Sequence, residues 1–215
     1  MKKEKIAYIV CGLMLVLVCG CGKSSDASNL QSTKEAKQTS NVTLVPTISP
    51  TLEPTTTPIP LQEIKITSES LTEEGMWLTA ITGKGANPKG LNQTPQLSWN
   101  TVEGASCYAI YMYDASARYW LHWKAGNITT TSIDMGAELE MSKYFGPYPP
   151  SGTHEYQVIV YALKEPVEKC PGTMDSPAID IRTNEENLDE INGSTGNIIG
   201  KGILSGKVTI GLKVE

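Results

Sequence analysis

The stretch GPYPPSGTHEY, residues 146–156, decides more about the fold and the site than any other part of this chain. Each proline fixes its own φ angle and lacks a backbone donor, so the first seven residues predict a stiff loop. His154 comes directly after this loop and opens an expected strand over residues 155–163. A stiff loop that delivers an imidazole to the end of a strand is one way to build a small pocket.

The second of the two histidines, His122, lies within YWLHW, residues 119–123. Imidazole donates hydrogen bonds and carries charge near neutral pH, which suits a phosphate or carboxylate ligand. A histidine between tryptophans in a strand also occurs as a packing residue. The residues by themselves leave both interpretations open.

Working outward, the pattern predicts a mostly β domain. Alternation and β-branched or aromatic residues predict strands over residues 76–82, 96–100, 106–114, 119–128, 155–163 and 206–214. In the third of these, Ile110 and Met112 share one face, and Ala109, Tyr111 and Tyr113 share the other. One helix is expected, capped by Thr183, with Glu185 and Glu186 in its first turn and Gly193 at its end. Trp99, Trp120 and Trp123 are expected to be largely buried.

Four segments occur in a recognisable order and spacing: TPQLSW at 94–99, residues 108–114, His122-Trp123, and the stretch 146–156. Together they resemble the phosphatidylethanolamine-binding proteins, most of all the bacterial Raf-kinase-inhibitor-like branch, over about residues 70–215. The resemblance implies a mostly β fold, the β-sandwich of that family, with a short helix before the last strand. It also implies a small anion-binding cavity near one end of the sandwich.

The same resemblance implies which residues line the cavity: Asp114, His122, Gly146, Pro147, His154 and Tyr156. An acidic Asp-Pro-Asp-x-Pro loop completes the cavity in this family. Counting back from His122 aligns Asp114 with the second Asp of that loop. Met112 and Tyr113 then stand where the family has its first Asp and the following Pro. On this alignment the chain lacks the Asp that faces the ligand and a histidine, which would weaken or alter binding.

The first 21 residues resemble a bacterial lipoprotein signal. Lys2, Lys3 and Lys5 precede an apolar run over residues 6–18 that is shorter than the ~20 residues of a membrane span. The run ends in VCGCG, in which small Gly20 precedes Cys21, so Cys21 is the expected lipidated residue. Cys19 follows the bulky Val18 and fits this role less well. An uncleaved anchor helix and a plain secretory signal are the alternatives.

Residues 22–61 are expected to form a disordered stalk. Of the 38 residues from Lys23 to Pro60, 19 are Ser, Thr or Pro, so the segment lacks the apolar mass to offset the entropy of ordering. Such a segment can carry O-glycans. The folded domain is expected over residues 62–215, where 13 of the 14 aromatic residues lie. We therefore expect a domain lifted from the outer face of the cytoplasmic membrane by a lipid anchor and a spacer.

Charge and spacing exclude several classes of partner. The formal net charge is −5, which argues against a nucleic-acid binder because such a protein needs a basic face. No CxxC or HxxxH spacing occurs, so we expect neither a metal nor another cofactor. Cys107 and Cys170 could form a disulfide outside the cell, or remain two separate thiols, and their spacing favours no bridge.

Three functions remain as hypotheses. The first is a membrane-tethered module, not an enzyme, that binds a small anion or a phosphate-bearing headgroup. The second is a protein-interaction module with a degenerate pocket, for example an inhibitor of an extracellular hydrolase, because members of the family are implicated in regulating kinases and proteases. The third is a weak hydrolase in which His122 or His154 acts as general base and Asp114 orients it.

The lipoprotein hypothesis yields the first prediction. Cys21→Ser should leave an unprocessed precursor that incorporates no lipid, because the substitution removes the acceptor thiol. Metabolic labelling with a radioactive fatty acid, followed by gel analysis, measures both properties. Cys19→Ser is the matched control and should be labelled normally. Normal labelling of Cys21→Ser would move the assignment to Cys19.

Overall fold

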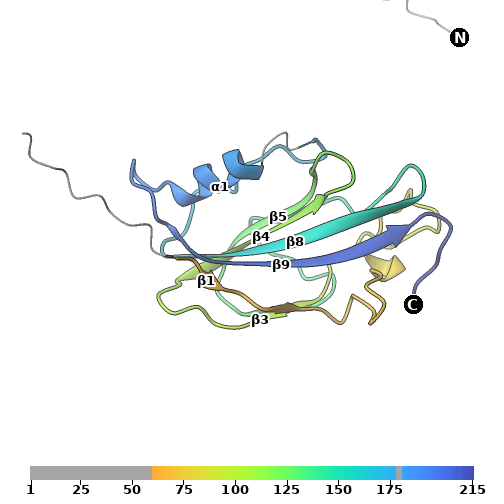
Figure 1. The fold of residues 1–215 in the computed structure, drawn as a ribbon, viewed down its shortest axis with the longest axis horizontal. Coiled ribbons are helices and arrows are strands. Elements are labelled where there is room, and N and C mark those ends of the chain that lie inside the picture. Colours follow the sequence, from red (N-terminus) through yellow and green to blue (C-terminus); the bar gives the residue numbers. More distant parts are fainter. Residues whose placement is uncertain (1–59, 178–180) are drawn as a thin grey trace, which may run out of the picture. The chain divides into compact units, whose positions relative to one another are not determined.

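The computed structural model describes residues 60–177 and 181–215 (Figure 1). The expectations for the signal, Cys21 and most of the stalk concern residues outside these ranges. The described residues contain nine strands, one short 3-10 helix and one α-helix. The fold is mostly β, with the helix α1 (Ile181–Asp189) ahead of the last strand, as the sequence predicts.

The strands form two sheets. The main sheet has the order β1-β9-β8-β4-β5-β7, and the small sheet has the order β2-β3-β6. The strands of the main sheet are β1 (Gln62–Glu63), β9 (Ile198–Thr209), β8 (Thr153–Leu163), β4 (Cys107–Asp114), β5 (Trp120–Ile128) and β7 (Lys143–Tyr144). Those of the small sheet are β2 (Ile66–Thr67), β3 (Leu97–Trp99) and β6 (Ser132–Ile133). β1 runs parallel to β9, and the other neighbours are antiparallel.

Strand β4 lies at the centre and is buried on both faces. Ile110 and Met112 point into the core between the two sheets, together with Trp99 of β3 and Trp123 of β5. The alternate residues of β4 point into a second core on the opposite face of the main sheet, and they are Cys107, Ala109, Tyr111 and Tyr113. The two faces divide these residues as the sequence predicts, because successive side chains of a strand point in opposite directions.

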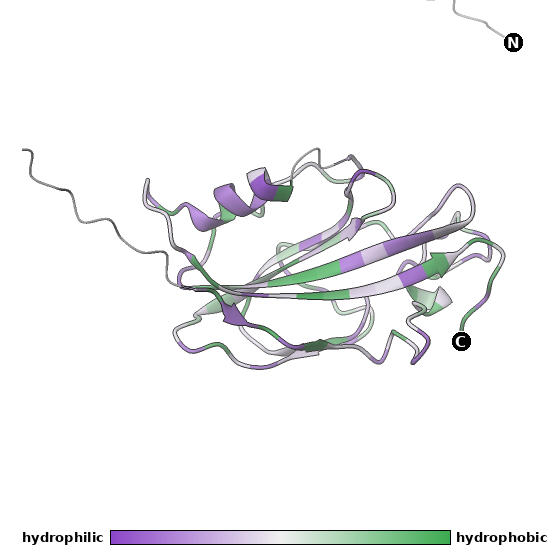
Figure 2. Ribbon diagram, in the orientation of Figure 1, coloured by the Kyte–Doolittle hydropathy of each residue, from purple (hydrophilic) through white to green (hydrophobic). Residues whose placement is uncertain are grey.

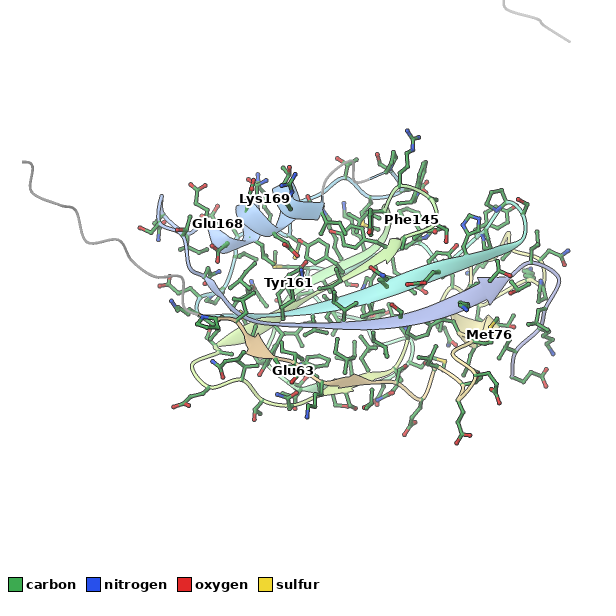
Figure 3. All side chains as sticks on the ribbon, viewed as in Figure 1. Glu63, Met76, Phe145, Tyr161, Glu168 and Lys169 are labelled. Atoms are coloured by element: carbon green, nitrogen blue, oxygen red, sulfur yellow. The ribbon has the colours of Figure 1, made fainter. Side chains whose placement is uncertain are left out.

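Helix α1 covers the second core mainly through polar contacts. Leu188 is its buried hydrophobic residue, and Figure 2 shows the rest of the helix as largely hydrophilic. Tyr161 lies between the main sheet and α1 (Figure 3), and its hydroxyl donates to Oε1 of Glu185 at 2.7 Å. Nδ2 of Asn184 donates to the hydroxyl of Tyr113 at 3.1 Å. Buried tyrosines thus give the helix specific partners on an otherwise apolar face.

The sequence-based bounds are wrong in three places. Residues 76–82 form no continuous strand: Met76 and Trp77 make isolated bridges, and residues 79–81 form the 3-10 helix η1 (Thr79–Ile81). The last strand covers residues 198–209 and not 206–214. The helix ends at Asp189, well before Gly193, and contains Thr183. At residues 76–82, backbone hydrogen bonds to distant segments, such as Thr79 N–H to the carbonyl of Val214 at 2.9 Å, override the local pattern.

Trp99 and Trp123 are buried as predicted, but Trp120 is only half-buried. Trp120 is the first residue of β5, and its Nε1 donates to Oδ1 of Asp175 at 3.0 Å on the surface. Trp123 is enclosed in the core, and its Nε1 donates to the hydroxyl of Ser142 at 3.0 Å. The local pattern does not show that β5 emerges from the core at Trp120.

Two further findings concern the possible disulfide and membrane-spanning helices. Cys107 and Cys170 are both buried free thiols in the second core, so the structure contains no bridge between them. Within residues 60–177 and 181–215, no helix is long and apolar enough to span a bilayer.

The tryptophans of β5 give the second prediction. Trp123→Ala should lower the free energy of unfolding by about 3–5 kcal/mol, because the change leaves a cavity in the core between the sheets. Trp120→Ala is the matched control on the same strand and should cost clearly less, since its ring is partly in water. Urea denaturation followed by circular dichroism measures both. Equal losses would mean that Trp120 is packed as tightly as Trp123.

Candidate functional site

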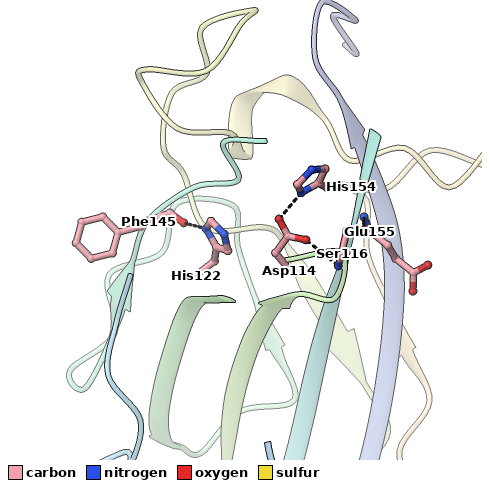
Figure 4. Close-up of polar contacts among 6 residues, drawn as sticks. All are labelled: Asp114, Ser116, His122, Phe145, His154 and Glu155. Carbon is pink, nitrogen blue, oxygen red and sulfur yellow. Dashed lines mark hydrogen bonds and ion pairs between the residues drawn. The ribbon is translucent and has the colours of Figure 1, made fainter. Parts of the chain in front are cut away.

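The candidate site is built around Asp114, the last residue of β4. Asp114 lies directly opposite Tyr156 of β8, so their side chains point to the same face of the sheet. Its side chain is buried, and its oxygens are held separately (Figure 4): Oδ2 accepts from Nδ1 of His154 at 2.7 Å, and Oδ1 accepts from the backbone N–H of Ser116 at 2.9 Å. A buried carboxylate requires such partners because desolvation of its charge is costly.

His154 is fixed by this contact at the start of β8. It stands two residues before Tyr156 and therefore shares its face of the sheet. Because the carboxylate of Asp114 can only accept, Nδ1 of His154 carries a proton in this contact. Nε2 makes no hydrogen bond with any described residue and belongs to a side chain that is partly open to solvent. The ring can therefore offer Nε2 to a ligand.

His122 reaches the same face through a β-bulge. Met112 pairs with Trp123, but the next residue, Tyr113, pairs with Leu121, so His122 is the extra residue of β5. A bulge changes the direction of a side chain and is common beside functional sites. As a result His122 packs edge-on against the ring of Tyr156, with centroids 5.2 Å apart at 78°.

Two hydrogen bonds to Phe145 hold His122. The backbone N–H of Phe145 donates to the carbonyl of His122 at 2.8 Å. Nδ1 of His122 contacts the carbonyl of Phe145 at 2.8 Å, and since a carbonyl can only accept, Nδ1 carries the proton. Burial lowers the pKa of His122, although the carbonyl of Phe145 and the charge of Asp114 act in the opposite direction. The structure therefore favours a neutral ring whose Nε2 is an acceptor.

Tyr156 lies between the histidines and has an unsatisfied hydroxyl. Its ring also stacks on His154, with centroids 6.5 Å apart at 25°. The hydroxyl is closed off from solvent and makes no hydrogen bond in this structure, although it lies near Asp114 and the backbone of Tyr148. Burial first, and then Asp114, raise the pKa of this hydroxyl well above its ordinary value. A buried polar group without a partner is rare and calls for a functional explanation.

Gly146 and Pro147 position the loop and supply no free donor. A Cβ atom at Gly146 would lie 2.4 Å from the carbonyl oxygen of Ile81, so only glycine fits against this backbone. The N–H of Gly146 donates to Oδ1 of Asn92 at 2.8 Å, and the carbonyl of Pro147 accepts from Gly83 at 2.9 Å. The loop is thereby docked on the segment 81–92. The N–H of Gly146 is already bound and Pro147 has no N–H, so neither residue can donate a backbone hydrogen bond to a ligand.

The structure places neither Met112 nor Tyr113 in the site. Met112 is fully buried in the core between the sheets, and Tyr113 points into the second core. Asp114 makes the contact to a histidine that the alignment treated as lost. The turn between β4 and β5 covers residues 115–119, with positive φ angles at Arg118 and Tyr119.

Some residues of the site were not found from the sequence. Phe145 orients His122 through its backbone, and no side-chain pattern marks such a role. Ser116 completes a turn with Asp114, and its hydroxyl accepts from the N–H of Glu155 at 2.9 Å. In an Asx turn, the side chain of an Asp accepts a hydrogen bond from the backbone N–H two residues later. The Asp at position 114, at the end of an expected strand, was a signal for such a turn over residues 114–116.

Two cavities lie away from the histidines. A narrow one of about 10 Å³ is bounded by Trp77, Pro149 and Val208, among others. A wide groove of about 920 Å³ separates α1 from the loop 165–173, where Figure 3 shows Glu168 and Lys169. Across the two described ranges, no group of three or more His, Cys, Asp or Glu side chains could hold a metal ion.

Comparison with known proteins agrees with this architecture. The family model of the phosphatidylethanolamine-binding proteins matches residues 67–209, more than half of the chain. A UPF0098 protein from Methanothermobacter thermautotrophicus is 31% identical over 103 residues, covering 39% of this chain and 68% of the relative. The chain therefore belongs to the phosphatidylethanolamine-binding protein family. Neither description states a catalytic activity.

One solved structure supports the fold, and a second is reported beside it. The crystal structure of Escherichia coli YbcL, described as a new member of the mammalian PEBP family, has a TM-score of 0.53 and 24% identity to this chain. The match covers 68% of this chain and 98% of YbcL. A phosphatidylethanolamine-binding protein homologue from Chlamydia trachomatis, CT736, has a TM-score of 0.46 and 20% identity, with 68% and 97% of the two chains covered.

The unsatisfied hydroxyl gives the third prediction. Tyr156→Phe should leave the free energy of unfolding unchanged or raise it by about 1 kcal/mol, because the change removes a buried polar group that has no partner. Tyr144→Phe is the matched control: its hydroxyl donates to the carbonyl of Ile81 at 2.7 Å, so its removal should cost about 1 kcal/mol. Urea denaturation of both variants decides. A clear loss in Tyr156→Phe would show that Asp114 or Tyr148 does bind this hydroxyl.

Proposed function

We propose that residues 62–215 form a binding module that holds a small anion or a phosphate-bearing headgroup between His122 and His154. A lipid on Cys21 tethers this module to the outer face of the cytoplasmic membrane, and residues 22–61 act as the spacer. The arrangement of the histidines supports the proposal most directly. Each ring is fixed through Nδ1 to a protein acceptor, at 2.8 Å and 2.7 Å, and each keeps Nε2 for a ligand.

The charges indicate that binding is local and weak. From Gln62 onward the chain has a formal net charge near −7, so its long-range field repels anions. Within the site, the carboxylate of Asp114 is already occupied by hydrogen bonds from Nδ1 of His154 and the N–H of Ser116. The attraction must therefore come from hydrogen-bond donors at short range. We expect a dissociation constant on the order of millimolar, which corresponds to about 4 kcal/mol.

The family supports a ligand-binding role of this kind. Its description names a phospholipid, phosphatidylethanolamine, whose headgroup carries a phosphate. The rigid frame of the site agrees with such a role, because Asp114, Tyr156 and His154 lie on paired strands and not on a free loop. Asp114 contacts His154 and not His122 in this frame, so a general base oriented by Asp114 would be His154.

One observation favours the second candidate, a protein-interaction module. Phe145 and Tyr148 flank the site on the loop after β7, and their side chains are 50% and 58% exposed. Exposed aromatic residues are enriched at protein interfaces. For a lipid-anchored protein, an extracellular hydrolase is the most sensible partner. Replacing both residues by Ser should abolish inhibition of such a hydrolase and leave binding of phosphate unchanged.

The fourth prediction tests the anion site. Phosphate and phosphoethanolamine should bind the domain of residues 62–215, without its lipid anchor and stalk, at pH 5.5. Binding should be weaker at pH 7.5, because imidazole side chains, whose ordinary pKa is near 6.5, lose their positive charge as pH rises. His154→Ala should abolish binding because it removes the imidazole that offers Nε2 to the ligand beside Asp114. Chemical-shift titration by NMR measures the affinities.

Thr153→Ala is the control for this titration. Thr153 is exposed at the start of the same strand, and its hydroxyl bonds Thr209 at 2.8 Å, away from Asp114. This variant should bind like the native domain. Absence of binding at both pH values, or unchanged binding by His154→Ala, would contradict the proposal and leave a family fold without a phosphate site.

A further inference from the structure

The groove between α1 and the loop 165–173 lies on the other face of the main sheet from the histidines. Tyr156, which contacts both histidine rings, belongs to the core between the sheets, whereas Cys170, which lines the groove, belongs to the second core. We infer that this groove binds a short peptide with free termini, whose carboxylate lies at one end beside Lys124 and whose ammonium group lies at the other end beside Glu190. The groove is thus a second site, and it does not depend on the function proposed for the histidines.

One end of the groove is basic. Lys124 of β5 reaches the loop, where its Nζ donates to the carbonyls of Cys170 at 2.9 Å and Gly172 at 2.6 Å. An ammonium group has three donors, so one donor of Lys124 remains for a ligand. Lys143 of β7 is directly opposite Lys124 and shares its face of the sheet. Lys169 on the loop also lines the groove, and Figure 3 shows it beside α1.

The positive charges of this basic end are not compensated by the protein. Within residues 60–177 and 181–215, neither Lys124 nor Lys143 nor Lys169 forms an ion pair. Like charges directly opposite each other on paired strands are destabilising. Burial lowers the pKa of Lys124, Cys170 raises it, and the charges of Lys143 and Lys169 lower it further. A carboxylate of a ligand would accept from the third donor of Lys124 and relieve this repulsion.

The other end of the groove is acidic. The buried side chain of Asn197 joins the loop to α1, because its Nδ2 donates to the carbonyls of Glu165 at 3.2 Å and Leu188 at 3.3 Å. Glu165 therefore lies beside the C-terminal end of α1, and Glu190 directly follows the helix there. Both glutamates line the groove, and across the described ranges neither carboxylate has an ion-pair partner. An ammonium group is the complement of such an end.

The length of the groove matches a tripeptide. A Cβ atom at Gly172 would lie 3.1 Å from Nδ2 of Asn184, so Gly172, and with it the Nζ of Lys124, lies beside Asn184 of α1. Asn184 and Glu190 are six residues apart, which corresponds to about 9 Å along a helix axis. An extended peptide advances about 3.3–3.6 Å per residue, so the two charged termini of a tripeptide are separated by a similar distance. The groove volume of about 920 Å³ lies within the range of small-ligand sites.

The helix supplies hydrogen-bond acceptors between the two charged ends. Asn184 and Asn187 line the groove, and their Nδ2 atoms donate to the hydroxyl of Tyr113 at 3.1 Å and to the carbonyl of Thr183 at 2.6 Å. Their Oδ1 atoms have no hydrogen-bond partner among the described residues. A peptide carries backbone N–H donors between its termini, so it offers these oxygens the partners that they lack.

The experiment compares trialanine with its N-acetylated and C-amidated forms in NMR titrations of the full chain in detergent micelles. Trialanine should bind most tightly. Amidation should weaken binding about ten-fold, because it removes the charge that meets the partly buried Lys124. Acetylation should weaken binding about three-fold, because Glu165 and Glu190 are exposed to solvent and their attraction is screened. The side-chain amide resonances of Asn184 and Asn187 should shift on binding.

Two variants assign the ends of the ligand. Lys169→Gln should weaken binding of trialanine about two-fold and leave binding of its amide unchanged. Glu190→Gln should weaken binding of trialanine about two-fold and leave binding of its acetylated form unchanged. Both side chains are exposed, so we expect both variants to fold. The matched controls are Lys164→Gln and Glu186→Gln, which change exposed residues that do not line the groove and should bind like the native chain.

Several outcomes would overturn the inference. They are equal affinities for the three peptides, unchanged resonances of Asn184 and Asn187, or shifts confined to His122 and His154. Tight binding of the acetylated form would show that the groove takes an acidic ligand without a positive end, and would also overturn it. None of these outcomes affects the phosphate titration, so the two sites are tested independently.

Discussion

The fold depends on one constraint: strand β4 has no face that tolerates water. All eight of its residues are buried, although a strand with one solvated face would alternate buried and exposed residues. Each face must therefore be covered by a separate layer. The small sheet covers Ile110 and Met112, whereas α1 and the loop 165–173 cover Tyr111 and Tyr113. This requirement for two layers explains why an α-helix with little apolar surface is retained on a mostly β domain.

The same constraint places the site. At Asp114 strand β4 ends, and the chain turns away through residues 115–119 to reach β5. The two N–H···O contacts of this turn with β8, Ala115 to Glu155 at 2.8 Å and Glu155 to Ser116 at 2.9 Å, fix the point where the carboxylate leaves the core. His154 and Tyr156 are then opposite it on a strand that is paired on both sides. The site thus lies at one end of the core, and the packed strands hold its side chains in place.

The sequence predicts what local pattern controls. The alternation of β4, the long strands β5 and β8, the helix before the last strand and the proximity of the histidine motif to a strand end all follow from residue types and spacing. Contacts between distant segments control the rest. The bonding of Thr79 to Val214 replaces an expected strand by η1, and the contact between Asp114 and His154 joins residues 40 positions apart in the chain. The backbone of Phe145, which decides the protonated nitrogen of His122, leaves no trace in its own side chain.

The free-energy cost of burying the polar groups of Asp114, His122 and Tyr156 is itself an argument that these groups have a function. Packing alone does not explain these groups, because buried ion pairs can often be replaced by well-packed apolar side chains at little or no loss of stability. Instead the domain buries a carboxylate, holds a histidine neutral against two nearby carboxylates, and encloses a tyrosine hydroxyl that has no partner. Two apolar cores on the faces of β4 supply the free energy that makes this arrangement tolerable. Energetically unfavourable features of this kind are common at functional sites. Here they occur in the side chains whose unpaired atoms could bind a ligand.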